Sequence, residues 1–91
     1  MRIEVQLPGL LADCAGGARL VSVDAETVAG ALDALFASYP LLRVHLADES
    51  RQLRRHVLVF YNDTSTRHLP SLDVPLNAGD RLHVIQAVSG G

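Results

Sequence analysis

The residues with the clearest capacity for chemistry are the last five, Ala87-Val88-Ser89-Gly90-Gly91, which place a terminal carboxylate on two glycines. Glycine buries no side chain and loses the most backbone entropy on ordering, so packing gives no reason for this ending. Three extended residues beyond Val88 reach about 10 Å. A terminal carboxylate, with a reference pKa of about 3.3–3.7, is ionised at neutral pH. The pattern favours a tether that carries a carboxylate into a partner's active site, and a plain flexible chain end is the alternative.

Other reactive side chains are too few or too scattered to predict a catalytic centre. The only cysteine, Cys14, cannot form an internal disulfide, and a lone cysteine is usually a small buried hydrophobe. The histidines lack metal-ligand spacing; they are His45, His56, His68 and His83. The sequence has no nucleophile elbow and no glycine-rich phosphate loop. We therefore expect a protein that is not itself an enzyme and that binds no metal or cofactor of its own.

Composition predicts one small globular domain. The chain has 91 residues, of which 48% are hydrophobic and 20% charged, and this balance argues against disorder. The net charge of −2 gives no general attraction to nucleic acid or to an anionic membrane. No apolar run is long enough to span a bilayer, and the N-terminus has no signal-peptide pattern. We expect a cytoplasmic protein.

Hydrophobic periodicity predicts five strands and one long helix. Alternating or unbroken apolar segments predict strands over residues 2–7, 19–23, 57–61, 64–69 and 81–88. Between the second and third of these, apolar residues recur at helical spacing, at Val28, Ala31, Leu32, Leu35, Phe36 and Tyr39. Asp24 or Thr27 can cap the start of this helix, and Pro40 prevents its continuation.

The segment 41–55 carries weaker signals. Its apolar residues predict a short packed turn up to Leu46, followed by a loop. Close behind lies a small basic group: Arg51, Arg54, Arg55 and His56. We expect this group to form a solvated loop face, because such surface charges are common. Contact with an acidic partner or a phosphate is the alternative.

The order of the elements, β-β-α-β-β-β, predicts an α+β domain of two layers. A single amphipathic helix has to lie across one face of a mixed sheet of about five strands. This order matches the β-grasp, or ubiquitin-like, arrangement. We expect residues 1–88 to form the β-grasp domain and residues 89–91 to form a flexible tail.

Several segments in this order make the chain similar to a known family. They are Val-Phe-Tyr-Asn-Asp at 59–63, Arg67, Leu-Asn-Ala-Gly-Asp at 76–80, the helix over 27–39 followed by Pro40, and the ending at 87–91. On these, the chain resembles the ThiS/MoaD-like ubiquitin-like sulfur carriers. The segment 41–55 is longer than the thiamine thiazole carriers usually have, so the resemblance favours carriers that serve the biosynthesis of cysteine or of specialised thio-metabolites.

The resemblance implies a carrier that acts as a co-substrate. A partner, the E1-like adenylating enzyme, uses ATP and Mg²⁺ to convert the Gly91 carboxylate into an acyl-adenylate. Sulfide or a persulfide then displaces AMP and leaves a thiocarboxylate, whose sulfur passes to a biosynthetic acceptor enzyme. Ser89 and Gly90 would thread a narrow channel, because glycine has no Cβ. The carrier is expected to be a monomer when alone, without nucleic-acid or membrane partners.

Two other functions fit the same pattern. The chain could be the small sulfur-carrying subunit of molybdopterin synthase, with its tail inserted into a partner's active site. It could also be a ubiquitin-like modifier that is conjugated to lysines of other proteins. All eight basic residues of this chain are arginine, so it offers no lysine for chains of itself.

Strand alternation also predicts a docking surface. If Leu82 and Val84 face the helix, then His83 and Ile85 lie on the open face of the sheet, and Leu58 and Phe60 join them from the neighbouring strand. These four side chains would form an exposed, mostly apolar patch beside the root of the tail. The alternative is that the segment 41–55 covers them, and a register shift of one residue would reverse the assignment.

Overall fold

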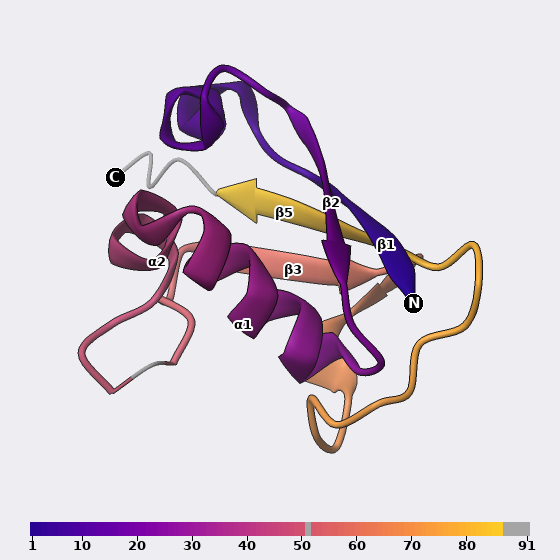
Figure 1. Cartoon of the computed structure of the whole chain (residues 1–91). Coiled ribbons are helices and arrows are strands. Elements are labelled where there is room, and N and C mark those ends of the chain that lie inside the picture. The colour runs from indigo at the N-terminus through magenta and orange to yellow at the C-terminus, as the bar shows by residue number, and fades with distance from the viewer. Residues whose placement is uncertain (51, 87–91) are drawn as a thin grey trace.

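Five strands form one mixed sheet in the computed structural model, which describes residues 1–50 and 52–86 (Figure 1). The strands are β1 (Arg2–Gln6), β2 (Leu20–Asp24), β3 (Val57–Tyr61), β4 (Thr64–Ser65) and β5 (Arg81–Gln86), and their order in the sheet is β2-β1-β5-β3-β4. β5 pairs in parallel with β1, whereas the other neighbours are antiparallel. This confirms the predicted α+β, β-grasp fold with one main helix across one face.

The long helix α1 (Val28–Ser38) begins at Thr27, so the choice between Asp24 and Thr27 as its cap falls on Thr27. The Gly30 amide donates to Thr27 Oγ1 at 3.0 Å. The first helical amides have no partner within their own helix. Here the amides of residues 28 and 29 donate to the carbonyls of Val74 and Leu72, at 3.1 and 2.8 Å. The crossover before β5 therefore stabilises the start of α1.

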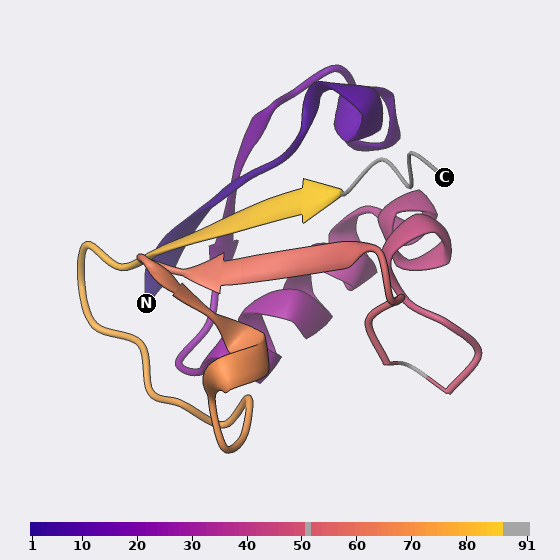
Figure 2. The same ribbon diagram turned by 180° about the vertical axis from the view of Figure 1, so that it is seen from behind.

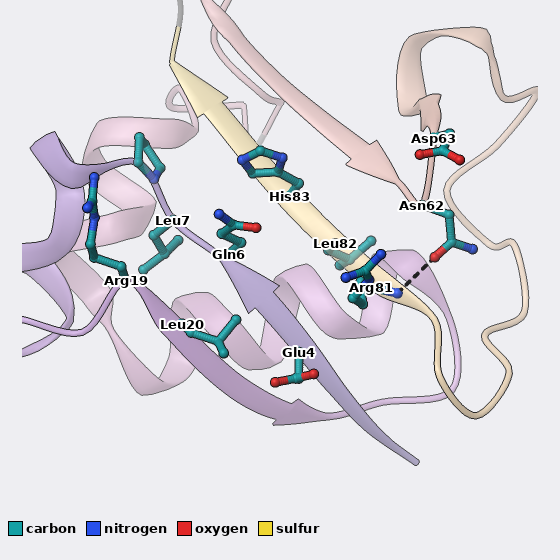
Figure 3. A pocket seen from close by; sticks show the side chains of 11 residues that line it. Glu4, Gln6, Leu7, Arg19, Leu20, Asn62, Asp63, Arg81, Leu82 and His83 are labelled. Atoms are coloured by element: carbon teal, nitrogen blue, oxygen red, sulfur yellow. Dashed lines mark hydrogen bonds between the residues drawn. The ribbon is translucent and has the colours of Figure 1, made fainter.

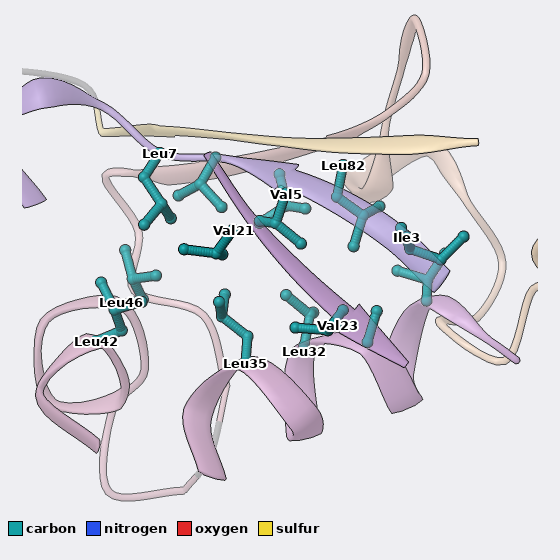
Figure 4. Packing of buried hydrophobic residues seen from close by; sticks show 14 of the residues in the cluster. Ile3, Val5, Leu7, Val21, Val23, Leu32, Leu35, Leu42, Leu46 and Leu82 are labelled. Carbon is teal, nitrogen blue, oxygen red and sulfur yellow. The ribbon is translucent and has the colours of Figure 1, made fainter. Parts of the chain in front are cut away.

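The core lies between α1 and the sheet, with apolar side chains from both layers meeting in the middle (Figure 4). Period-two alternation puts Ile3 and Val5 of β1, Leu82 and Val84 of β5, and Val57 and Val59 of β3 on this inner face, and all six are buried. From the helix, Val28, Ala31, Leu32 and Leu35 point back at them. The predicted inward faces of these strands and of the helix are confirmed.

The segment after α1 is a second helix, α2 (Pro40–Leu46), where the sequence predicted a packed turn. Pro40 stands in its first turn, where the missing amide costs nothing. Leu42 and Leu46, four residues apart, are fully buried. α2 packs against a 3₁₀ helix, η1 (Gly9–Ala15), in the long β1–β2 connection, for which the sequence predicted no helix.

The predicted strand over residues 64–69 is wrong in length. β4 ends at Ser65, and a 3₁₀ turn, η2 (Thr66–His68), follows it. Ser65 Oγ accepts a hydrogen bond from the Arg67 amide at 3.3 Å, so the hydroxyl caps the turn and ends the pairing. Thr66 turns into the core and is buried. Over the described ranges 1–50 and 52–86, neither α1 nor α2 is long and apolar enough to cross a membrane.

Truncating a central core side chain should destabilise the fold. Leu35 is fully buried, so Leu35→Ala should lower the free energy of unfolding by about 2–5 kcal/mol. Leu41 on α2 is 59% exposed, and Leu41→Ala should change it by less than about 0.5 kcal/mol. Urea unfolding followed by circular dichroism measures both. Equal losses in the two variants would contradict the described packing.

Candidate functional site

The tail residues predicted to carry the chemistry, Ser89, Gly90 and Gly91, lie outside the described residues, as does the boundary of the predicted domain at residue 88. The structure does describe the strand that precedes them in the sequence. Gln86 is the last described residue of β5, and β5 lies in the sheet between β1 and β3. The C-terminal residues therefore come after a central strand that is hydrogen-bonded on both sides.

The four predicted patch residues come together as two cross-strand pairs. Leu58 lies opposite Ile85, and Phe60 lies opposite His83, in the antiparallel pairing of β3 with β5. The residues that alternate with them, Val57, Val59, Leu82 and Val84, are buried, so the four point to the open face of the sheet, which Figure 2 views from the side away from α1. His83 is exposed and the other three are half-buried. The predicted register is therefore confirmed, and a role in docking stays a prediction.

The helix α2, which forms the first part of the segment 41–55, does not cover this patch. α2 lies on the same side of the sheet as α1, where Leu42 and Leu46 join the core beneath β1 and β2 (Figure 4). This placement follows from the spacing of the two leucines, which must both face the core. We call these four residues the sheet patch: Leu58, Phe60, His83 and Ile85. The sheet patch thus faces away from both helices.

A polar hollow adjoins the sheet patch, and the sequence did not predict it (Figure 3). Its volume is 670 Å³, and its charged and polar lining includes Glu4, Gln6, Arg19, Asn62, Asp63, Arg81 and His83. Glu4 and Arg81 are register partners, as are Gln6 and His83. The open face is therefore apolar along β3 and polar along β1, with His83 shared by both. The parallel pairing of the first strand with the last creates this hollow, and no local pattern reveals such a pairing.

The end of β5 is tied to α2 through the start of β3. Gln86 is paired with Val57, whose amide donates to the Arg54 carbonyl at 3.0 Å. The Arg54 amide donates to the Leu46 carbonyl at 2.9 Å, and its guanidinium donates twice to the Val44 carbonyl, from Nε at 3.2 Å and Nη2 at 3.0 Å. Arg54 thus binds the carbonyls that α2 leaves unpaired at its C-terminal end.

The rest of the predicted basic group separates in the structure. His56 lies beside the end of β5, with its Nε2 3.4 Å from Nε2 of Gln86. Arg55 is exposed, and Arg51 lies outside the described residues. The solvated loop face predicted for this group therefore fits Arg55 but not Arg54, which is half-buried and holds α2. Arg54 comes soon after α2 in the sequence, which is compatible with a contact to the end of that helix. No sequence rule predicts that the chain turns back to make this contact.

Arg67, one of the residues behind the family resemblance, secures the start of β3. Its Nη2 donates to the Arg55 carbonyl and to the Val57 carbonyl, the latter at 3.2 Å. Both acceptors are backbone oxygens, so the contact depends on the path of the backbone at residues 55–57 and not on the side chains there. Arg67 therefore fixes the start of β3, where Val57 pairs with Gln86.

The two other internal segments of the resemblance meet at the opposite end of the sheet, around the Asp80 carboxylate. It accepts hydrogen bonds from the Asn77 amide at 2.7 Å, the Tyr61 hydroxyl at 2.9 Å and the Asn62 side-chain amide at 3.1 Å. The Asn77 amide most of all, then Asn62 and Tyr61, lower the pKa of Asp80 below its ordinary value of 3.8. The same hydrogen bond to Asp80 raises the pKa of Tyr61. This network joins the β3–β4 turn to the turn before β5.

Two further sequence predictions concern metal and thiol chemistry. Cys14 lies half-buried in η1 and packs against the core. Within the part of the chain that the structure describes, residues 1–50 and 52–86, no three side chains of His, Cys, Asp or Glu come together in a group that could hold a metal ion.

The mixed five-stranded β-grasp sheet with a helix across one face is the fold of the ubiquitin-like proteins. The chain belongs to the ThiS family, which its sequence matches over residues 5–91. It is 30% identical to the sulfur carrier protein CysO of Mycobacterium tuberculosis over the whole of both chains.

Solved structures show the same relationship. The chain superposes on one chain of the Amycolatopsis orientalis BexX/CysO complex with a TM-score of 0.84 and 28% identity, covering 98% of this chain and 99% of that one. For small archaeal modifier protein 1 of Haloferax volcanii the TM-score is 0.80 and the identity 32%, covering 96% and 98%. The similarity therefore extends over the complete fold in each case.

The Asp80 network makes a pH-dependent contribution to stability. Because the folded protein lowers the pKa of Asp80, the ionised carboxylate stabilises the fold fully above about pH 3.8, and this contribution is lost as the pH falls through the lower folded value. Asp80→Asn should therefore unfold at lower urea concentration than the wild type at pH 7. The difference should shrink as the pH falls below about 3.8. Urea midpoints for both proteins at pH 7, 5 and 3 measure it, and a difference that does not vary with pH would contradict the assignment.

Proposed function

We propose that this protein is a sulfur carrier, and that the C-terminal carboxylate of Gly91 is the group that is activated and converted to a thiocarboxylate. One observation supports this above the others: the similarity to CysO runs through the full length of both chains, and this chain ends in Gly90-Gly91. The position of β5 supports it as well. A tail that follows a central strand is presented by the most firmly paired element of the sheet.

The carrier's own contribution is presentation of the carboxylate, and the chemistry belongs to partners. An ionised carboxylate resists attack by an anionic nucleophile, so it must first be activated. An E1-like adenylating enzyme joins it to the α-phosphate of ATP with release of pyrophosphate, using Mg²⁺. Hydrosulfide then attacks the carbonyl carbon, a C–S bond forms, and AMP leaves with the electrons of the C–O bond. No oxidant or reductant is consumed in these two steps.

The thiocarboxylate then serves an acceptor enzyme. The name of the relative, CysO, supports cysteine biosynthesis as the destination, and a specialised thio-metabolite pathway is the alternative. The BexX/CysO complex supports a carrier that acts by binding a partner protein. In either case the carrier presents a soft sulfur nucleophile on a flexible tether. The acceptor supplies the electrophile.

Replacing Gly90 should block activation without affecting the fold. Gly90→Leu adds a branched side chain to a tail that has to pass through a narrow channel, so we expect thiocarboxylate formation to fall by about 100-fold. The measurement is intact mass after incubation with the adenylating enzyme, ATP, Mg²⁺ and sulfide. The wild type should gain the mass difference between one sulfur and one oxygen atom.

Ser89→Ala is the matched control, because it changes the tail without adding bulk, and it should be activated like the wild type. Thermal unfolding should be the same for all three proteins. A Gly90→Leu variant that forms thiocarboxylate at the wild-type rate would refute the threading of the tail. A wild type that gains no mass with a competent enzyme would refute the carrier function itself.

The sheet patch is the proposed docking surface for the partner enzymes. Its Leu58–Ile85 pair lies next to the Val57–Gln86 pair at the C-terminal end of β5, and an enzyme that takes up Gly91 has to approach this end. Full burial of an exposed apolar side chain is worth about 1.5–3 kcal/mol, and each half-buried side chain of the patch gains a part of this when an interface covers it. The exposed His83 at its margin gives the surface a polar edge next to the hollow.

Ile85→Gln should weaken docking and leave the chemical step unchanged. We expect KM for the carrier in the adenylation reaction to rise by about tenfold with kcat unaltered, equivalent to about 1.4 kcal/mol of lost binding. Leu20→Gln is the control, since Leu20 is 55% exposed on the edge strand β2. Steady-state pyrophosphate release measures both parameters. A lowered kcat with unchanged KM would place Ile85 outside the docking surface.

Protein modification is a second candidate function, favoured by the similarity to small archaeal modifier protein 1. The same acyl-adenylate would then be attacked by a lysine amine of a target protein, with loss of AMP and formation of an isopeptide bond to Gly91. Mass spectrometry of cell extracts for lysines that carry the C-terminal residues of this chain distinguishes the two functions. A carrier yields free thiocarboxylate, and a modifier yields such adducts.

A further inference from the structure

Exposed apolar side chains gather on the two short helices at one end of the sheet. Among residues 1–50 and 52–86, the large hydrophobic side chains with high exposure are Met1, Leu10, Leu20, Leu41 and Val44. Leu10 on η1 is 77% exposed, and Leu41 and Val44 on α2 are 59% and 54% exposed. Leu41 and Val44 are three residues apart and so are neighbours on the outer face of α2. We name Leu10, Leu41 and Val44 the apolar rim.

The apolar rim lies at the end of the sheet where β5 stops. β1 runs parallel to β5 and leads directly into η1, so η1 is at the same end as Gln86. α2 is held there by the contacts from Leu46 through Arg54 to Val57, the register partner of Gln86. Figures 1 and 2 both show β5 ending between the levels of η1 and α2.

The inner sides of these helices are already used. Leu11 and Ala15 of η1, and Leu42 and Leu46 of α2, are buried in the core, and the two helices pack against each other. The Arg54 guanidinium holds the Val44 carbonyl, so the outer face of α2 is presented by a fixed backbone. The apolar rim is therefore left over after the fold is satisfied. Neighbouring exposed apolar side chains of this kind mark an interaction surface.

The length of the tail identifies what meets this surface. Residues 87–91 span at most about 18 Å when fully extended, at about 3.3–3.6 Å per residue. An enzyme whose active site holds Gly91 must therefore bring the mouth of its channel close to Gln86, and hence against η1 and α2. This step rests on the proposed carrier function.

The reaction supplies a reason for an apolar mouth. The acyl-adenylate of Gly91 reacts with hydrosulfide to give thiocarboxylate and AMP. Water can attack the same carbonyl carbon; AMP then leaves, a proton is released and the carboxylate is formed again. This hydrolysis consumes ATP without forming thiocarboxylate. Exclusion of water from a closed site prevents such side reactions. Of the partners, the adenylating enzyme is the one that holds this hydrolysable intermediate.

We infer that the apolar rim, Leu10, Leu41 and Val44, docks on an apolar mouth of the adenylating enzyme's channel and seals it against water while the Gly91 acyl-adenylate exists. The sheet patch provides recognition on the open face, and the rim provides the seal on the side of the two helices. The helix α2 thus has a role in coupling ATP use to sulfur loading.

The test is the amount of AMP formed for each thiocarboxylate. The triple variant Leu10→Gln, Leu41→Gln and Val44→Gln is incubated with the purified adenylating enzyme, ATP, Mg²⁺ and sulfide. AMP is measured by chromatography and thiocarboxylate by intact mass. The wild type should give a ratio close to one, and the triple variant should give a ratio raised severalfold, because water reaches the acyl-adenylate. Glutamine is a good helix former, so α2 should stay folded.

Two control proteins isolate the seal. Leu20→Gln makes the same change at a similarly exposed leucine on β2 and should keep the wild-type ratio. The variant Leu41→Met with Val44→Ile keeps the rim apolar and should also keep it. Thermal unfolding of each variant shows whether the fold is intact.

Three outcomes would overturn the inference. A triple variant with the wild-type ratio shows that the rim seals nothing. A wild type that sediments as an oligomer, with a triple variant that sediments as a monomer, shows that the rim is an interface between copies of the chain. A wild type that forms no thiocarboxylate at all refutes the carrier function, and the inference about the rim then fails as well. A wild type that is loaded normally, with an unchanged ratio in the triple variant, refutes the seal alone.

Discussion

The parallel pairing of β1 with β5 is the contact on which the other features depend. It joins the first strand of the chain to the last, and it places β5 between two partners. With β5 in this position, Ile85 and His83 meet Leu58 and Phe60 on one side, while Glu4 and Gln6 of β1 form the polar hollow on the other. Without it the sheet would separate into a β1–β2 hairpin and a β3–β5 unit, and the last strand would be an edge.

Most of the fold could be predicted from the sequence because its strongest signals are local. The stripe on α1, the alternation in β1 and β5 and the apolar run of β3 each specify both an element and its buried face, and the structure agrees with all of them. The errors lie where short segments rely on distant contacts. Leu42 and Leu46 form a helix because η1 lies against them, and Ser65 ends β4 with a side-chain hydrogen bond that competes with the sheet. Propensity alone decides neither case.

The candidate site divides in the same way. The sheet patch was predictable because period two and one buried strand determine which side chains face outward. The polar hollow, the contact of His56 with Gln86 and the hold of Arg54 on α2 were not predictable, because each joins residues whose proximity depends on the return of the chain. The carboxylate on Asp80 is an intermediate case. Its motif was visible in the sequence, but the joining of its two segments into one network appears only in three dimensions.

The central position of β5 also has a mechanical consequence. A partner that draws the C-terminal residues into a channel in line with β5 pulls along the axis of that strand, because these residues follow Gln86 in the sequence. The hydrogen bonds to β1 and β3 run across this axis, so a pull loads both ladders in shear and has to strain many bonds at once. A tail on an edge strand pulled sideways would instead open its bonds one after another. The fold is thus a stiff anchor in the direction in which its function applies force.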